Sequence, residues 1–353
     1  MITTDYDVTA SLSAASRDEL SQLLASREGK PVRLCGSGSG QARLPPAPEP
    51  VALVSLSRMK RLVRFEPDDQ TCSVEPGMPR AELDVLLAQK GLCLPCAGTG
   101  TIGGIFATGE HGPLAPGAQS PRSLLLGLEG LLSDGTPFQS GARVVKSVAG
   151  FDLHKLFVGS RGRLFAATLL HLKLSPLPRS RLIFGEAHRD LDEALARFLQ
   201  IRNLATAPKI LVLAKVAGAF SVRGVFEGGA QLLSRTEKML ALRTATQEPD
   251  LHVAAPAGAE VVSGLVRPSR AKLLAGVFPP TTSFLVDGGG RFEAALSADE
   301  ADAVLAALPG IEAQAEIRIG ARNRRGRATP LDPAALGLCH RIKKALDPQG
   351  MLL

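Results

Sequence analysis

The stretch Ala97–Gly112, A-G-T-G-T-I-G-G-I-F-A-T-G-E-H-G, has the residue types best suited to hold a ligand. Six of its sixteen positions are glycine, three are threonine and one is acidic. Glycine lets a backbone approach another molecule closely, and threonine adds hydroxyl groups at low steric cost. Amides and hydroxyls gathered in this way suit a polyanion such as a diphosphate. A glycine-rich surface loop is the alternative interpretation.

Two further glycine-rich segments favour the ligand interpretation. Residues 36–40, G-S-G-S-G, follow an expected strand, and residues 146–162 read K-S-V-A-G-F-D-L-H-K-L-F-V-G-S-R-G. The first segment does not fit the Rossmann fingerprint, because the third glycine of G-x-G-x-x-G would fall at Gln41. Four prolines between residues 45 and 50 forbid a helix directly after it. A phosphate bound here would be held by amides and serine hydroxyls.

Composition narrows the class of protein. The chain has 353 residues, enough for two domains, and its 45% hydrophobic and 21% charged content is that of a globular protein. Aromatic residues make up 4%, which argues against the base-stacking modules of nucleic-acid binding. The net charge of +7 is mostly dispersed. One basic cluster is either a mobile surface loop or a docking surface for partners: Arg318, Arg322, Arg324, Arg325 and Arg327.

The five cysteines do not suggest a disulfide framework. Cys93 and Cys96 form a C-x-x-C pair that could be redox-active or half of a metal site. Because no second pair completes a tetrahedral set, we expect free thiols and no metal. The N-terminus lacks the pattern of a secretory signal, and no apolar run approaches the ~18 residues of a membrane span. We therefore expect a cytoplasmic protein, peripheral to the inner membrane at most through partners.

Periodicity predicts an α+β protein with a domain boundary at Pro176 and Pro178, dividing it into residues 1–176 and 177–353. In the first part we expect helices at 16–29, 80–89 and 152–157, strands at 32–35, 51–57, 62–65, 71–75 and 164–174, and a hairpin or strand end at 123–135. The second part is expected to be an antiparallel sheet domain with a C-terminal helix within 331–349. Its other predicted helices are 191–202, 231–243 and 301–308, and its predicted strands are 182–187, 210–216, 220–226, 284–287, 292–295 and 311–319.

Together these segments resemble the vanillyl-alcohol-oxidase, or PCMH-type, FAD-binding family. Four matches in order carry the resemblance: the 36–40 loop after a strand, V-E-P-G at 74–77, T-I-G-G at 101–104, and V-A-G-F-D with L-F-V-G-S-R-G between 148 and 162. Three more segments are similar to the small FAD-binding subunits of bacterial glycolate oxidases: A-T-G-x-x-G-P at 107–113, V-K-S-V-A-G-F-D-L-H-K-L at 145–156, and R-I-K-K-A-L-D-P-Q-G at 341–350.

The resemblance implies a two-lobed FAD-binding domain, a smaller antiparallel α+β cap domain, and a cofactor-binding set spread over the glycine segments. It implies that Gly36, Ser37, Gly38 and Ser39 contact the pyrophosphate. Gly98, Thr99, Thr101, Gly103 and Gly104 would line the diphosphate and flavin, with Pro76, Gly77, Gly100 and Ile102 in the same set. Ala107, Thr108, Gly109 and Gly112 would lie against the ring system, and Gly150 and Asp152 near the adenosine.

Three departures from the family pattern bear on chemistry. The first glycine loop has no histidine, so we expect non-covalent FAD. Phe165 stands where relatives have a glycine and is expected to crowd the adenine wall. The histidine-rich G-D-G-N-x-H segment of relatives that oxidise 2-hydroxy acids is missing, and none of the histidines of the second part, His188, His252 and His340, lies beside a paired acid or asparagine in the sequence.

No catalytic residue is therefore assigned. A flavin dehydrogenase needs a base for the hydroxyl proton and a cation for the substrate carboxylate. His111 is a candidate base, with a structural loop histidine as the alternative, and Arg122 and Lys146 are candidate cations.

Three functions remain open. The first is an accessory or electron-relay FAD subunit of a glycolate (2-hydroxy acid) oxidase complex, with a larger FAD-binding subunit and an iron–sulfur subunit as partners. The second is a self-contained FAD oxidoreductase acting on an alcohol or aldonolactone. The third is a scaffold that kept the fold without the flavin. We expect no nucleic-acid partner.

Overall fold

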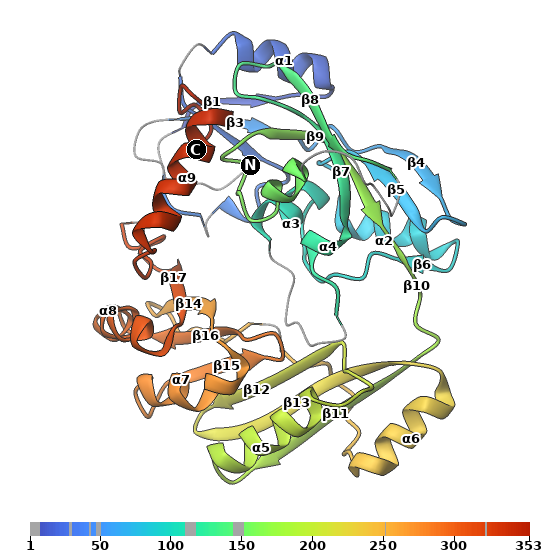
Figure 1. Ribbon diagram of the computed structural model, residues 1–353, viewed down its shortest axis with the longest axis vertical. Helices are drawn as coiled ribbons and strands as arrows, with labels where there is room; N and C mark the ends of the chain where they lie inside the picture. Colours follow the sequence, from blue (N-terminus) through green and yellow to red (C-terminus); the bar gives the residue numbers. More distant parts are fainter. Residues whose placement is uncertain are drawn as a thin grey trace.

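The computed structural model describes residues 8–27, 30–41, 44–46, 51–109, 118–143, 152–250, 252–321 and 323–353. In this part of the chain, strands form sheets of three, five, seven and two strands. Figure 1 shows them in two halves, with the seven-stranded sheet and its helices in the lower half. No helix of the described part has the length and apolar content needed to cross a lipid bilayer.

The first sheet is parallel and positions the first glycine segment. Its strands, in sheet order, are β1 (Val8–Ser13), β3 (Val51–Ser55) and β2 (Val32–Cys35). Helix α1 (Arg17–Ala25) begins where predicted, because the Ser16 side chain accepts a hydrogen bond from the Glu19 amide. Strand β2 ends at Cys35, so the chain leaves the sheet directly into the 36–40 segment.

The five-stranded sheet is antiparallel and carries the main core of the first half. Its strands, in sheet order, are β4 (Leu62–Glu66), β5 (Thr71–Val74), β9 (Ala166–Lys173), β7 (Leu125–Leu131) and β8 (Pro137–Gly141). Strands β7 and β8 form the predicted hairpin. Phe165 is fully buried between Phe138, at a ring distance of 5.0 Å, and Phe157, at 5.9 Å. The remaining elements are α2 (Arg80–Ala88), α3 (Ile102–Thr108), α4 (Pro121–Leu124), the 3-10 turn Leu153–Phe157, and the paired strands β6 (Leu92–Cys93) and β10 (Ser175–Pro176).

The second half is the predicted antiparallel α+β unit, built on one sheet. Its order is β11 (Ser180–His188), β13 (Ala219–Gly228), β12 (Ile210–Val216), β15 (Ser283–Asp287), β16 (Arg291–Leu296), β14 (Glu260–Leu265) and β17 (Gln314–Ile319). Its helices are α5 (Leu191–Arg202), α6 (Ala230–Leu240), α7 (Ala271–Val277) and α8 (Ala298–Ala307). Strand β14 and helix α7 are absent from the sequence-based prediction. Helix α8 begins three residues earlier than predicted, because Ser297 and Glu300 form a capping box.

The seven-stranded sheet has one apolar and one polar face at the β14–β16–β17 edge. Phe292, Ala294 and Ile317 join the core beneath the helices. The residues that alternate with these along β16 and β17 point to the opposite face, because successive side chains of a strand point to opposite faces of the sheet. On that face lie Arg291, Glu293, Glu316, Arg318 and Ser263, and they line two cavities there.

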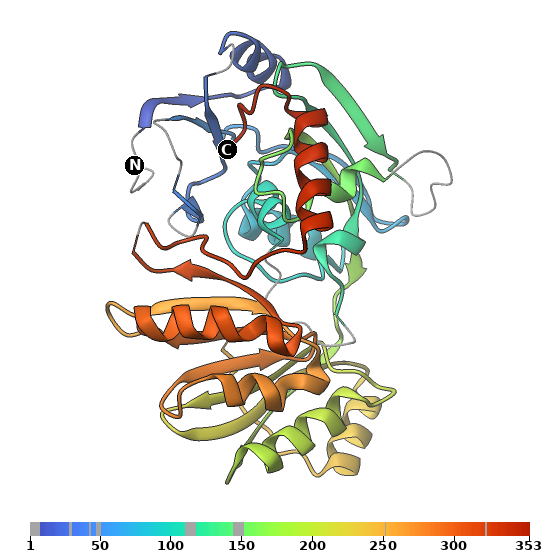
Figure 2. The same cartoon turned by 60° about the vertical axis from the view of Figure 1, so that its left-hand side comes forward.

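The C-terminal helix α9 (Pro333–Leu346) returns to the first half (Figure 2). Lys343 donates hydrogen bonds to the Asp347 carboxylate, to the Leu352 carbonyl at 2.6 Å and to the Arg163 carbonyl at 2.6 Å. Asp347 also accepts the Leu352 amide at 2.8 Å. Burial would raise the pKa of Asp347, but Lys343 and the backbone donors outweigh it and hold this pKa below its usual range. The tail is thereby aligned so that Leu352 pairs with Val32 at the edge of β2.

We predict that Lys343→Ala lowers the free energy of unfolding by about 1.5–3 kcal/mol, the usual contribution of charge-assisted hydrogen bonds, because it removes the partner of the buried Asp347 carboxylate. Lys344 is exposed on the same helix, and Lys344→Ala should change stability by less than about 0.5 kcal/mol. Urea denaturation of both variants measures the difference. Equal midpoints would show that the tail is not held by Lys343.

Candidate functional site

The glycine segment that begins at Ala97 is partly helical, although no helix was predicted there. Helix α3 begins after Thr101, whose side-chain oxygen accepts the Gly104 amide at 3.3 Å, and ends at Gly109, whose φ of 67° is left-handed. Ile105 is buried with the neighbouring Phe106. The I-x-x-I-F spacing of residues 102–106 was the sequence signal for this helix.

Several glycines are required by contacts between chain segments. A Cβ atom on Gly36 would lie 2.0 Å from Thr101 Oγ1, and one on Gly103 would lie 2.6 Å from Pro76 Cβ. Gly98 and Gly100 have φ values of 136° and 90°, which side chains rarely adopt. These glycines let the first turn lie directly against the start of α3.

The contact creates a cleft between the two segments, at the end of β2. A smaller cavity beside it, here called the hollow, shares Gly36, Thr101 and Gly104 with the cleft. Most of the sequence-predicted cofactor residues line the cleft or the hollow. They are Gly36, Ser37, Gly38, Ser39, Gly98, Thr99, Thr101, Gly104, Ala107 and Thr108 in the cleft, and Pro76 and Gly103 in the hollow.

The other predicted residues lie elsewhere. Ile102 is buried in the core of the first half, and Gly77 packs beneath the Leu56 carbonyl. Gly100 lines neither space, and a Cβ atom on it would lie 2.8 Å from the Ser39 hydroxyl oxygen. Asp152 is exposed at the start of the 3-10 turn. Gly109 lines a second cavity, whereas His111, Gly112, Lys146 and Gly150 fall outside the described residues.

Arg161 is a lining residue that the sequence analysis did not select. It contributes to both the cleft and the hollow, and its amide donates to the Ala107 carbonyl at 2.7 Å. Its φ of 57° is left-handed, and its guanidinium pairs with Glu316 of β17. The side chain thus links the cleft to the second half. Arg161 belongs to the segment L-F-V-G-S-R-G at 156–162 that carried the family resemblance. Its ion pair could not be predicted from that segment, because Glu316 lies 155 positions away in the sequence.

Phe165 does not line the cleft. Phe157, on which it stacks, lines the hollow, and Phe165 itself fills the core between Phe157 and Phe138. Phe165 lines neither the cleft nor the hollow, so the described residues give no support to the expectation that it crowds the adenine wall.

Cys35 and Cys96 have the properties of buried thiols, and Cys93 is partly buried. Burial raises the pKa of Cys35, which lines the cleft, to about 11, and that of Cys96 to about 11. The pKa of Cys93 is also raised, chiefly by burial, and neither member of the C-x-x-C pair is in a disulfide. A reactive cysteine needs the opposite shift, a lowered pKa that favours the thiolate.

The polar face of the seven-stranded sheet corrects the expectation for His252. Its Nδ1 lies 3.0 Å from Glu293 Oε1, so the tertiary structure gives this histidine a paired acid. Arg291 bonds the same carboxylate. Burial would raise the pKa of Glu293, but His252 and Arg291 outweigh it and the pKa is lowered, so the carboxylate is ionised.

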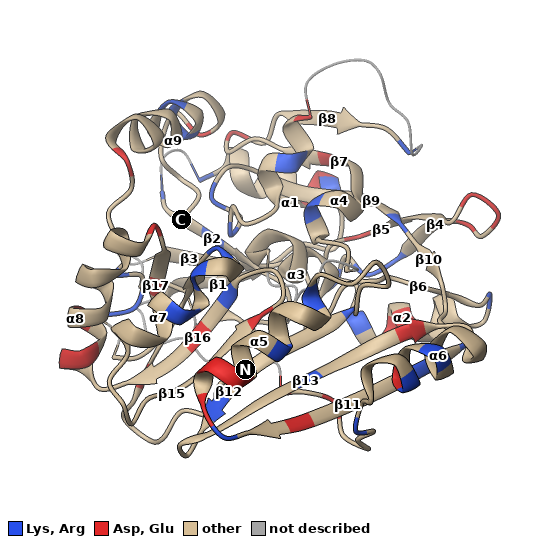
Figure 3. Cartoon of the chain, turned by 60° about the horizontal axis from the view of Figure 1, so that its bottom comes forward, with Lys and Arg blue, Asp and Glu red and all other residues tan. Residues whose placement is uncertain are grey.

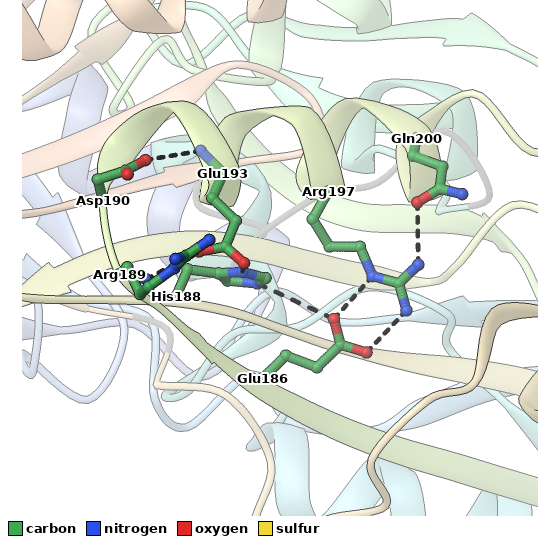
Figure 4. Close-up of polar contacts among 7 residues, drawn as sticks. All are labelled: Glu186, His188, Arg189, Asp190, Glu193, Arg197 and Gln200. Carbon is green, nitrogen blue, oxygen red and sulfur yellow. Dashed lines mark hydrogen bonds and ion pairs between the residues drawn. The ribbon is translucent and has the colours of Figure 1, made fainter.

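A second histidine, His188, lies in an acidic cluster between β11 and α5 (Figure 4). Its ring nitrogens are 3.9 Å from Glu186 Oε2 and 3.9 Å from Glu193 Oε1. Arg197 binds Glu186 through two nitrogens, at 2.7 and 2.8 Å. The cluster fastens α5 to its sheet, and its residues do not line the two cavities on the polar face.

The described arginines of the basic cluster are largely engaged in ion pairs or buried. Arg324 binds Glu260 and Asp302, Arg327 binds Asp302, and Arg325 is 5% exposed. Arg322 lies outside the described residues. Figure 3 shows basic and acidic residues interspersed over both halves. The ion pairs fix this loop to β14 and α8, which removes much of the charge it could offer a partner.

Comparisons with known proteins concern mainly the first half of the chain, which contains most of the cleft. Residues 9–141 match the model of the family described as FAD binding domain. An uncharacterized FAD-linked oxidoreductase of Mycobacterium tuberculosis is 31% identical over 202 residues, 56% of this chain and 44% of that protein. The glycolate oxidase subunit GlcE of Escherichia coli is 33% identical over 184 residues, 48% of this chain and 53% of that subunit. The aligned region thus spans about half the length of these relatives.

The fold also matches a solved structure of alkyldihydroxyacetonephosphate synthase, with a TM-score of 0.70 over 96% of this chain and 75% of that one, at 13% identity. At that identity the likeness concerns the fold alone. Residues 9–141 form an FAD binding domain. Its cofactor is FAD.

We predict that Gly36→Ala lowers stability by about 1–3 kcal/mol, the usual cost of overpacking, because the new Cβ displaces Thr101 and the start of α3. It should also weaken FAD binding at least about tenfold, which corresponds to about 1.4 kcal/mol. Gly40 is the matched control: a Cβ there meets nothing within 4 Å, so Gly40→Ala should leave stability unchanged. Denaturation and flavin-fluorescence titration measure both effects. An unchanged Gly36→Ala protein would refute the contact.

Proposed function

We propose that this chain is the FAD-binding subunit of a 2-hydroxy acid oxidase or dehydrogenase complex that acts on glycolate or a close analogue. In this proposal it relays electrons or supports assembly, while substrate oxidation takes place mainly on a larger FAD-binding subunit, with an iron–sulfur subunit as further partner. The observation that carries the proposal is the convergence of the 36–40 turn and the start of α3 on one cleft. The similarity to GlcE supports the choice of complex.

The cleft suits the diphosphate of FAD. Ser37, Ser39 and Thr101 offer hydroxyl groups, and the turn offers backbone amides that approach a ligand without side chains between. Arg161 supplies positive charge at the wall, although its guanidinium is partly engaged by Glu316. We propose that these residues hold the pyrophosphate, and that Ala107 and Thr108 lie against the flavin ring. Bound FAD would supply the redox chemistry, and the residues described here bind and orient it.

We propose that FAD is held non-covalently. Among the described lining residues, Cys35 is the one with a thiol, and burial keeps this thiol protonated by raising its pKa to about 11. Its Sγ instead faces the Val54 carbonyl at 3.7 Å.

We predict that the protein, purified with FAD, is yellow and loses all its flavin to the supernatant on acid precipitation, because no bond retains it. Absorbance near 450 nm, a general property of oxidised flavins, measures both fractions. A yellow pellet would contradict non-covalent binding. A colourless protein that takes up no added FAD would contradict the proposed function and favour the scaffold.

The isolated chain should reduce no dye with glycolate or D-lactate, and activity should appear when the larger FAD-binding and iron–sulfur subunits are added. The reason is that the described cleft offers no base beside the proposed flavin position. Dye reduction is followed spectrophotometrically with FAD present in excess. Turnover by the chain alone would replace the accessory role with a self-contained oxidoreductase. That alternative draws support from the His252–Glu293 pair on the polar face of the second sheet.

A further inference from the structure

The turn at residues 159–162 holds Arg161 against the last turn of α3. The Gly159 amide donates to the Phe106 carbonyl at 3.2 Å, and the Arg161 amide donates to the Ala107 carbonyl at 2.7 Å. The φ of Arg161, 57°, is left-handed, which is unfavourable for a residue with a side chain. Such a conformation persists only where the surroundings fix it, so the backbone of Arg161 has a defined place at the wall of the cleft.

Glu316 approaches this arginine from the second half, on a well-anchored strand. Strand β17 places it opposite Ser263 of β14, and on its other side it forms a bridge with Ala328. Its carboxylate bonds Nη2 of Arg161 and lies 3.6 Å from Nε of Arg318. The backbone pairing and the two guanidinium groups leave Glu316 little freedom to move.

The Arg161 guanidinium still has donors to offer. Its Nη2 bonds Glu316, whereas Nε and Nη1 form no hydrogen bond with any residue that the structure describes. The side chain keeps 20% of its surface exposed, and the residue lines both the cleft and the hollow. A guanidinium presents its donors as a planar fork, so one nitrogen can stay on a carboxylate while the others bind a phosphate oxygen.

We propose that Glu316 is a positioning residue for FAD, which holds the Arg161 guanidinium so that its remaining nitrogens bind the diphosphate. The inference deepens the proposed function, because it rests on the FAD position proposed for the cleft. An arginine side chain loses rotamer freedom when it binds a ligand, and the ion pair with Glu316 meets that loss before FAD arrives. The second half thereby contributes to FAD affinity, and by linkage FAD stabilises the contact between the halves.

The test measures the dissociation constants of FAD, by flavin fluorescence, and of ADP, by calorimetry, on the full chain freed of flavin. ADP carries a diphosphate and lacks the flavin ring. We expect Arg161→Gln to weaken both ligands at least about tenfold, the loss of one charge-assisted contact. Glu316→Gln should weaken both about two- to tenfold, the cost of ordering one flexible side chain on binding. Glu316→Asp keeps the charge and should lie between wild type and Glu316→Gln.

The double variant separates positioning from a general structural effect. Because Glu316 acts through Arg161, Glu316→Gln should weaken neither ligand further in the Arg161→Gln background, and an equal loss in both backgrounds contradicts the inference. The control is Glu312→Gln. Glu312 pairs with Arg270 at 2.8 Å within the second half, so both affinities should stay unchanged. Thermal unfolding shows whether Glu316→Gln has folded, and Glu316→Asp carries the test if it has not.

Equal affinities of wild type and Glu316→Gln for both ligands overturn the inference. Tighter binding by Glu316→Gln also overturns it, because the carboxylate would then compete with the diphosphate for Arg161. Weakened FAD with unchanged ADP overturns the assignment to the diphosphate. Glu316-dependent ADP binding by a chain that takes up no FAD keeps the inference and overturns the proposed function. A flavin-binding chain whose variants all bind FAD and ADP alike does the reverse.

Discussion

The site depends on one steric constraint, the contact between Gly36 and Thr101. With a Cβ atom at Gly36 only 2.0 Å from the threonine hydroxyl, no other residue type fits without moving the start of α3. The same hydroxyl oxygen accepts the Gly104 amide, so the contact and the helix cap share one side chain. The end of β2 and the start of α3 are thereby held together, and the cleft between them opens at the carboxyl end of a parallel strand.

The two halves of the molecule meet through charge at the side of this cleft. Arg161 of the first half pairs with Glu316 of β17, and the polar face of the seven-stranded sheet continues from there through Arg318 to Arg291 and Glu293. The opposite face of these strands fills a hydrophobic core. Such a sheet can line a cavity with its polar face while its apolar face stays packed against the core, because alternate side chains of each strand point to opposite faces.

Local sequence patterns predicted most of the elements that build the frame. Helix α5 and strand β12 have the predicted bounds, and the Ser16 cap and the β7–β8 hairpin lie where expected. The elements that were missed are short or lack a clear period. Strand β14 has Gly264 within its six residues, and helix α7 has seven residues with an exposed Leu273. Helix α3 was not predicted because its glycines have low helix propensity, and the segment was interpreted as a loop.

The sequence alone determined the residue types at the cleft, since the two glycine turns, their hydroxyl groups and their order along the chain are local properties. Tertiary structure decided which glycines contact another segment and which face the open cleft, because that depends on how β2 and α3 pack. It also decided the partners of the charged groups. Arg161 pairs with Glu316 and His252 with Glu293 across long sequence separations, and Arg324, expected in a mobile loop or a docking surface, is bound by Glu260 and Asp302. Electrostatic pairing acts through space, so no spacing along the chain encodes these pairs between distant segments.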